Sequence, residues 1–286
     1  MIAAIETLKK RAGIVKMIRA FFDFRGFTEV ETAVRIPAPA PEPHIDCPPV
    51  ATGGFLRASP ELQMKKLLAA GMERIYQIGP CFRDGEKGSR HNPEFTMLEW
   101  YRRNAGYSDI RRDLEELMRT LFADAGRSDF SVRVVGVRDA YREIAGWDPW
   151  AAWDGDRFDL DMATRIEPWL RETGAGVFLT DYPVEAASLA KVSGADGERH
   201  AERWEFYWNG IELANCFSEL CDPSEQRCRF EAARAERKAL GEADYPLDGE
   251  FFGCLGDIGS AAGVALGIDR LVMALADAGE IDRLTV

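Results

Sequence analysis

Apolar residues recur along this chain at two spacings, which predict helices and strands. Side chains three or four residues apart predict one amphipathic helix over residues 5–25 and another around residues 114–121. Residues 131–137 and 176–182 are expected to be short strands, with a helix between them near 161–172. Near the end, an apolar run at 264–268 predicts a buried strand that leads into a helix over 269–278.

Capping and breaking residues place the boundaries of several elements. Gly26 is expected to end the first helix. Ser59 can cap a second helix that has Pro60 at its first position, and Asp222 can cap another. Six of the 14 prolines lie within residues 37–49. Because proline at every second position prevents helix and ladder hydrogen bonds, this segment is expected to be an extended arm or loop.

Two long antiparallel hairpins are expected, at residues 76–101 and 202–215. Within the second, Asn209-Gly210 is the strongest short hairpin signal in the chain, because both residues tolerate the positive φ of a two-residue turn. Hairpins interleaved with helices favour an α+β fold, in which helices flank a mainly antiparallel sheet, over a doubly wound parallel sheet.

The first hairpin carries candidate ligand-binding residues. Alternation in its returning strand places Phe95, Glu99 and Tyr101 on one face, and its outgoing strand ends at Arg83. The connecting loop, residues 84–93, adds further cations. An arginine at a strand end with cations nearby suits an anionic ligand such as a triphosphate. The alternative is that these are solvated loop charges beside a half-buried packing face.

The second hairpin brings two carboxylates together. With Asn209-Gly210 as the turn, Tyr207 pairs with Glu212 and Glu205 pairs with Ala214, so both glutamates share one face. Two carboxylates within diagonal reach repel each other unless a cation lies between them, and such oxygen ligands suit Mg²⁺ shared with a substrate phosphate. The alternative is a wet, polar sheet face of the kind common in antiparallel sheets.

The opposite face of that hairpin carries Trp204, Phe206 and Trp208 and is expected to be core. Strict alternation would turn Asn215 away from Glu212. One site could therefore use both side chains only if the strand has a bulge or ends between them.

A glycine-bounded apolar strand at residues 263–270 ends at Arg270. Glycine lets a ligand approach the backbone closely, and arginine stays charged at any physiological pH. Taken alone, the segment is also explained as a strand–helix junction with a surface arginine.

Composition and charge narrow the function classes. The chain has 286 residues, 46% of them hydrophobic, which excludes a disordered or low-complexity chain. It has 36 basic and 48 acidic residues, and the net charge of −12 disfavours non-specific binding to nucleic acid. No apolar run spans a bilayer and no leader pattern begins the chain, so a cytoplasmic protein without membrane partners is expected. The six cysteines form no C-x-x-C pair and are expected to be reduced thiols.

Four separated segments carry a recognisable combination of residues. They are Arg25-Gly26-Phe27 with Glu29-Val30-Glu31-Thr32, Phe82-Arg83 with His91-Asn92-Pro93-Glu94-Phe95, Gly210-Ile211-Glu212-Leu213-Ala214-Asn215, and Gly263-Val264-Ala265-Leu266-Gly267-Ile268-Asp269-Arg270. Together they resemble the catalytic core of a class II aminoacyl-tRNA synthetase of the lysyl type. The resemblance covers nearly the whole chain and implies a single catalytic domain over residues 1–286. Because it begins almost at residue 1, an N-terminal anticodon-binding barrel is not expected.

The resemblance implies a role for each matching residue in an enzyme that activates lysine with ATP. Arg83 and Arg270 would be its catalytic residues. The residues implied in ATP binding are Arg83, Glu86, His91, Asn92, Phe95, Glu212, Leu213, Gly267 and Arg270. Those implied in amino-acid binding are Ser59, Glu61, Glu99, Tyr101, Asn215, Glu219 and Ala265. Glu205 and Glu212 would hold Mg²⁺ on the phosphates.

Two positions resemble a short bacterial branch of the family, which joins (R)-β-lysine to a lysine side chain of translation elongation factor P. Ser59 and Ala265 match this branch where lysyl-tRNA synthetases usually carry Ala and Gly, although Ser59 is also explained as a helix cap. The implied partners are elongation factor P, (R)-β-lysine or lysine, and a second copy of the chain in a homodimer. The alternatives are a truncated lysyl-tRNA synthetase acting on tRNA, which the net charge disfavours, and a non-catalytic paralogue.

Three positions depart from the family pattern. Gly85 stands where the second motif usually carries a glutamate that reads the adenine amine, with Glu86 one residue further on. Ala33 replaces the proline that normally ends the first motif, which forms the dimer interface. Cys216 replaces a glycine in the segment that begins at Gly210 and resembles the family's lysine-binding segment.

Overall fold

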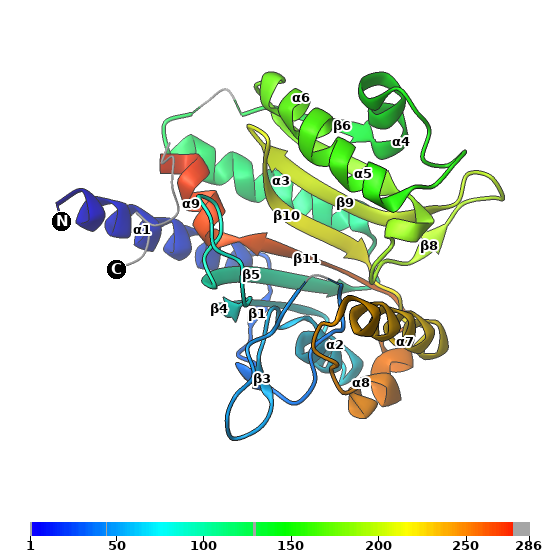
Figure 1. Cartoon of the computed structure of the whole chain (residues 1–286). Helices are drawn as coiled ribbons and strands as arrows, with labels where there is room; N and C mark the ends of the chain where they lie inside the picture. The colour runs from blue at the N-terminus through cyan, green and yellow to red at the C-terminus, as the bar shows by residue number, and fades with distance from the viewer. Residues whose placement is uncertain (1, 44, 128–129, 277–286) are drawn as a thin grey trace.

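The computed structural model describes residues 2–43, 45–127 and 130–276, and its main feature is one large sheet (Figure 1). The strands of this sheet are β1 (Thr28–Glu29), β4 (Arg74–Phe82), β5 (Glu94–Arg103), β6 (Val132–Gly136), β7 (Gly176–Tyr182), β8 (Val192–Ser193), β9 (His200–Trp208), β10 (Ile211–Ser218) and β11 (Ala261–Gly267). Their order is β1-β4-β5-β11-β10-β9-β7-β6, with β8 paired to β9. The β1–β4 and β6–β7 pairs are parallel, and the other pairs are antiparallel. A separate pair joins β2 (Arg35–Ile36) to β3 (Phe55–Leu56).

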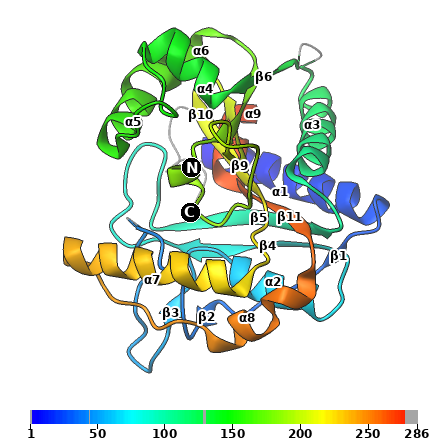
Figure 2. The ribbon, with the colours of Figure 1, turned by 90° about the vertical axis from the view of Figure 1, so that its right-hand side faces the viewer.

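Helices cover both faces of this sheet (Figures 1 and 2). They are α1 (Ile2–Phe24), α2 (Glu61–Ala69), α3 (Tyr107–Asp124), α4 (Val137–Ala140), α5 (Gly155–Asp161), α6 (Glu167–Glu172), α7 (Pro223–Leu240), α8 (Gly249–Cys254) and α9 (Ile268–Ala276). A π-helical turn continues α4, and another joins α5 to α6. The predicted α+β fold, with helices around a mainly antiparallel sheet, is confirmed.

The largest hydrophobic core lies between one face of the sheet and α1, α3 and α9. It contains Phe22 of α1, Leu117 of α3 and Val272 of α9. From the sheet it contains Trp100 and Trp204. The tryptophan-bearing face of the second hairpin is therefore core, as predicted. Burying side chains of this size contributes about 1.5–3 kcal/mol each to folding. This layer therefore holds one face of the central strands in the core and leaves only the opposite face available for a binding site.

The opposite face of the sheet is covered at its two ends and not in its middle. Helices α2, α7 and α8 pack at the β4–β5 end, around Leu68 and Phe251. Helices α4, α5 and α6 pack at the β7–β9 end, around Tyr141 and Leu179. Figure 2 shows these two helical groups on opposite sides of the central strands. The cavity described below lies between them, over β5, β11, β10 and β9.

Most predicted boundaries are confirmed to within a few residues. Helix α1 ends at Phe24, and Gly26 follows with a φ of 71°. Asp222 caps α7 by accepting hydrogen bonds from the N–H groups of Ser224 and Glu225, at 2.8 and 3.0 Å. The helix expected at 161–172 begins earlier, at Gly155, and includes a π-helical turn. Of the last predicted helix, residues 277–278 lie outside the described residues.

The proline-rich segment is an extended arm, as predicted. Its described residues from Pro37 to Pro48 belong to no helix or strand. The arm contacts α7, where the buried Arg237 side chain donates to the carbonyl oxygens of Glu42 and Ile45, at 2.9 and 3.1 Å. In the ranges that the structure covers, every helix is too short or too polar to cross a lipid bilayer.

Candidate active site

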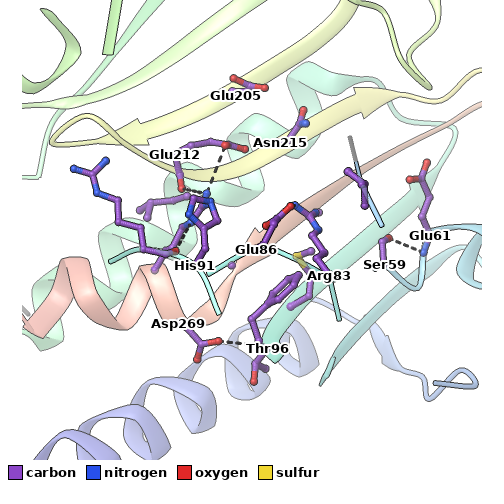
Figure 3. A pocket seen from close by; sticks show the side chains of 18 of the residues that line it. Ser59, Glu61, Arg83, Glu86, His91, Thr96, Glu205, Glu212, Asn215 and Asp269 are labelled. Atoms are coloured by element: carbon purple, nitrogen blue, oxygen red, sulfur yellow. Dashed lines mark hydrogen bonds and ion pairs between the residues drawn. The ribbon is translucent and has the colours of Figure 1, made fainter. Parts of the chain in front are cut away.

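A cavity of about 390 Å³ opens over the middle of the sheet (Figure 3). Fourteen of the residues singled out in the sequence line it. They are Ser59, Glu61, Arg83, Glu86, His91, Asn92, Phe95, Glu205, Glu212, Leu213, Asn215, Ala265, Gly267 and Arg270. These residues come from α2 and the turn before it, β5, β9, β10, β11, α9 and the β4–β5 loop. The fold therefore gathers segments far apart in the sequence into one site.

One row of directly paired residues crosses the sheet beneath the cavity. Glu99 of β5 pairs with Ala265 of β11, which pairs with Asn215 of β10, which in turn pairs with Glu205 of β9. Residues paired in register point to the same side of a sheet. Three adjacent strand pairings thus align these four side chains on the cavity face.

A β-bulge in β10 corrects one predicted pairing. Tyr207 pairs with Glu212, as predicted, but the register then shifts between Glu212 and Ala214. Ala214 consequently pairs with Phe206 rather than with Glu205, and Asn215 takes the place opposite Glu205. A bulge adds one residue to one strand and so reverses the alternation beyond it. It is the reason that Glu212 and Asn215, three residues apart, both line the cavity.

Cys216, the departure from the family pattern in this segment, points away from the cavity. It is fully buried in the core on the opposite face and pairs with Val264 and Trp204. Its side chain therefore alters packing behind the sheet and not the cavity wall.

The Glu205 carboxylate is held from three sides. Its Oε2 accepts hydrogen bonds from the hydroxyls of Tyr182 and Tyr207, each at 2.6 Å. Its Oε1 faces the Arg203 guanidinium at 2.5 Å. Arg203 also donates to the Oδ1 of Asn215 at 3.3 Å. One arginine thus orients both the carboxylate and the amide that sequence reasoning had selected.

The second carboxylate of the pair, Glu212, lies 3.5 Å from a guanidinium nitrogen of Arg270. Burial raises the pKa of Glu212, and the nearby negative charge of Glu205 raises it further. A carboxylate pair of this kind favours a cation between its members. Within the described ranges, no group of three or more His, Cys, Asp or Glu side chains could hold a metal ion alone. The pair therefore fits an ion that takes its remaining ligands from a phosphate and water.

Next to Glu212, two arginines and an aromatic ring line the cavity. The Arg83 guanidinium lies 5.3 Å from the centroid of the Phe95 ring. The buried Nε of Arg83 has no hydrogen-bond acceptor among the described residues, so it can donate to a ligand. Arg270 donates to the carbonyl oxygen of Glu212 at 3.0 Å and lies beside His91. Burial and the Arg270 charge lower the pKa of His91, which keeps this ring neutral at neutral pH.

The loop after Arg83 supplies a carboxylate near the position where this chain has Gly85 instead of the glutamate usual in the family. Gly85 has a φ of 76°, a left-handed conformation that glycine adopts without strain. Beyond it, Glu86 lines the cavity and lies 3.6 Å from Arg83 (Figure 3). An acidic side chain thus enters the site from one residue later in the chain.

A buried acidic cluster lies behind the Ser59 side of the cavity. The ammonium group of Lys65, a fully buried residue, is 2.5 Å from a carboxylate oxygen of Glu61 and 2.5 Å from one of Glu219. Helix α2 supplies both Glu61 and Lys65, four residues apart on the same helix face. Burial raises the pKa of Glu219 to about 8, although the Lys65 charge opposes the shift.

Glu99 completes this cluster. It is fully buried and accepts hydrogen bonds from the hydroxyls of Ser59 and Tyr101, at 2.6 and 2.8 Å. Burial, followed by repulsion from Glu61, raises its pKa to about 7. Glu99, Tyr101 and Glu219 do not line the cavity; they lie behind Ser59 and Glu61, which do. We refer to Glu61, Lys65, Glu99 and Glu219 as the acidic cluster.

Gly263 is required by this cluster rather than by a ligand at the strand. A Cβ atom at this position would lie 2.1 Å from the Tyr101 ring and 2.9 Å from Glu219. The glycine therefore lets Tyr101, its partner in β5, lie flat against the backbone of β11.

Sequence reasoning missed three cavity-side residues. Lys65 lies at the helical spacing of an ion pair from Glu61, a weak signal because such pairs are common on surfaces. Arg203 precedes Glu205 by two residues and so shares its strand face, a signal that was available. Glu42 lines the cavity from the proline-rich arm, where no periodicity exists to predict its direction.

Comparison with known proteins agrees with this geometry. The family model for tRNA synthetases class II (D, K and N) matches residues 3–286. The chain is 37% identical to the Elongation factor P--(R)-beta-lysine ligase of Vibrio cholerae, with 99% of this chain and 95% of that protein covered. It is 39% identical to the protein of the same name from Photorhabdus laumondii, with 95% and 91% covered. This chain therefore belongs to the class II tRNA synthetase family.

Proposed function

We propose that this protein activates lysine or (R)-β-lysine with ATP and transfers it to a lysine side chain of translation elongation factor P. One observation carries the proposal: a single cavity joins arginines suited to a phosphate chain to a buried acidic cluster suited to an amine-rich amino acid. The relatives described above are named for the same acceptor protein and the same β-amino acid.

The charge of the acidic cluster matches the substrate. Three carboxylates and one ammonium group give −3 + 1 = −2 when all are ionised. Lysine and (R)-β-lysine each carry two ammonium groups, which offset this charge. Their single carboxylate would lie toward Asn215 and Arg83. Because buried charges are costly unless paired, an amino acid with only one ammonium group would bind less well.

The first step requires positioning rather than a side-chain nucleophile. Arg83 would bridge the amino-acid carboxylate and the α-phosphate, and Phe95 and Arg270 would enclose the adenine. The carboxylate oxygen then attacks the α-phosphorus in line, and pyrophosphate leaves with the electron pair of the broken P–O bond. Positioning and neutralisation of charge supply most of the rate in such transfers.

Glu205 and Glu212 are the residues that would hold Mg²⁺. When bound, the ion supplies positive charge to the phosphates and orients them. Arg203 and the two tyrosine hydroxyls around Glu205 fix its carboxylate, so this ligand is pre-organised by the chain itself.

The test is the mass of purified elongation factor P after incubation with this protein, ATP, Mg²⁺ and either lysine isomer. A gain of one lysyl unit is expected, and the variant Arg270→Ala should abolish it because the guanidinium at the nucleotide end is lost. Arg199→Ala, at an exposed arginine that does not line the cavity, serves as the matched control. Unchanged elongation factor P, with tRNA charged in a parallel reaction, would overturn the proposal in favour of a tRNA-charging enzyme.

A further inference from the structure

The proline-rich arm is clamped so that one of its residues faces the cavity. Arg237 of α7 is fully buried and donates to the carbonyl oxygens of Glu42 and Ile45. A second guanidinium nitrogen faces the carboxylate of Asp46 at 2.5 Å. The carbonyl oxygen of Asp46 in turn accepts from the N–H of Asp84, the residue after the cavity arginine, at 2.7 Å. The chain at Glu42, Ile45 and Asp46 is thereby fixed against α7 and the β4–β5 loop.

Glu42 lines the cavity from this arm, together with Ser59, Glu61 and Arg83. Its side chain is half-buried, and the hydroxyl of Ser188 lies 3.5 Å from its Oε2. The groups that act on it electrostatically are Glu61 and Lys65 from α2, Arg83 after β4 and Arg203 from β9. Glu42 therefore lies toward Arg83 in the amino-acid site. In the proposed function, the carboxyl group of the substrate that reacts lies near this arginine.

Glu42 differs from the other acidic residues of the cavity in having no cationic partner. Glu61 pairs with Lys65, Glu86 with Arg83, Glu205 with Arg203, Glu212 with Arg270, and Asp269 with Arg11. Glu42 forms no ion pair with any residue of the described chain. A carboxylate of this kind is free to accept a proton during a reaction.

We propose that Glu42 is the catalytic base of the transfer step, in which the acceptor lysine attacks the aminoacyl adenylate. This inference rests on the proposed function and adds a residue to it. The acceptor ammonium first loses one proton to water, because only the neutral amine can attack. The amine nitrogen then bonds to the carbonyl carbon, and the C–O bond to AMP breaks with its electron pair leaving on AMP. Glu42 takes the second proton from the nitrogen, which leaves a neutral amide.

The electrostatics of Glu42 suit this task. Burial raises its pKa, and repulsion from Glu61 raises it further, while Arg83, Arg203 and Lys65 act in the opposite direction. A base works best when its pKa approaches the working pH, so a raised pKa makes the carboxylate a better proton acceptor.

The experiment separates transfer from activation. The enzyme is loaded with adenylate from ATP and lysine, mixed with elongation factor P between pH 6 and pH 9, and quenched for mass analysis. In Glu42→Gln, single-turnover transfer should fall by about 100-fold or more, the usual effect of losing a general base. Lysine-dependent ATP–pyrophosphate exchange should change far less. Hydroxylamine, which needs no protein base, should still trap the adenylate as lysyl hydroxamate.

Two further variants sharpen the test. Glu42→Asp keeps a carboxylate at shorter reach and should retain part of the transfer rate. Both variants should keep the rise in rate with pH that comes from the acceptor amine, but only Glu42→Asp should keep an additional rise as its carboxylate ionises. Glu185→Gln, at an exposed carboxylate three residues before Ser188, should behave as wild type. Unchanged transfer in Glu42→Gln would overturn the inference, and so would an equal loss in exchange through a higher KM for lysine. If wild-type enzyme forms adenylate but never modifies elongation factor P, the proposed function itself fails.

Discussion

At the scale of single residues, the acidic cluster links substrate binding to pH. Glu99 and Glu219 have pKa values of about 7 and about 8, both raised first by burial. Near neutral pH each therefore holds a proton part of the time. A substrate ammonium group favours the ionised carboxylates, so binding must expel these protons. Binding is thus weakest at acidic pH, strengthens as pH rises through 7 and levels off above 8.

We therefore expect the KM for lysine in ATP–pyrophosphate exchange to fall by about 100-fold between pH 6.5 and pH 8.5, because two protons are released and each contributes about tenfold over one pH unit. The side-chain ammonium of the substrate stays protonated over this range, since lysine side chains titrate near 10.4. Calorimetry in buffers of different ionisation enthalpy should show proton release on binding. Glu219→Gln, which cannot titrate, should release fewer protons. Lysine binding with no proton release in the wild-type protein would contradict this account.

At the scale of elements, the contact between β5 and β11 depends on a missing side chain. Because a Cβ at Gly263 would lie 2.1 Å from the Tyr101 ring, Gly263→Ala must displace the ring or part the two strands. We expect a loss of about 1–3 kcal/mol in the free energy of unfolding, the usual cost of overpacking. We also expect a raised KM for lysine, because Tyr101 holds Glu99. Chemical denaturation and pyrophosphate exchange measure the two effects.

The control for this variant is Gly253→Ala in α8, where a Cβ meets no atom within 4 Å. Alanine there should leave stability unchanged or raise it slightly, because glycine is the poorer helix former. If both variants behave alike, the close approach of Tyr101 to β11 has no energetic consequence.

Elements also show what sequence can and cannot predict. The helix over 5–25 and the hairpin turn at Asn209-Gly210 follow from local periodicity and local φ preferences, so they were predictable. No local signal predicts the bulge after Glu212. The sequence indicates only that a bulge or strand end is needed if Glu212 and Asn215 are to face the same site. The direction of Glu42 was not predictable, because it depends on Arg237, which is 195 residues away in the chain. Local signals thus place the strands, while distant contacts decide which side chains enter the cavity.

At the scale of the whole molecule, α1 presents apolar and basic side chains outward. Phe24 is 88% exposed and Ile5 is 48% exposed. A hollow along the same helix, between these two residues in the sequence, is lined by Leu8, Arg11, Ala12, Val15, Lys16 and Arg19. The motif that resembles the family's dimer-forming segment begins directly after Phe24. Large exposed apolar side chains on such a surface favour contact with another protein surface.

We therefore propose a homodimer formed through α1 and β1. Light scattering after gel filtration should give about twice the chain mass of 32.0 kDa. Phe24→Asp should shift the protein toward the single-chain mass, because a carboxylate buried between two copies has no partner. Leu160→Asp in α5, at an apolar residue 61% exposed on another part of the surface, should leave the mass unchanged. A wild-type protein with the mass of one chain at micromolar concentration would exclude the dimer. In that case Phe24 would need another explanation, and the site over the sheet would have to work within a single chain.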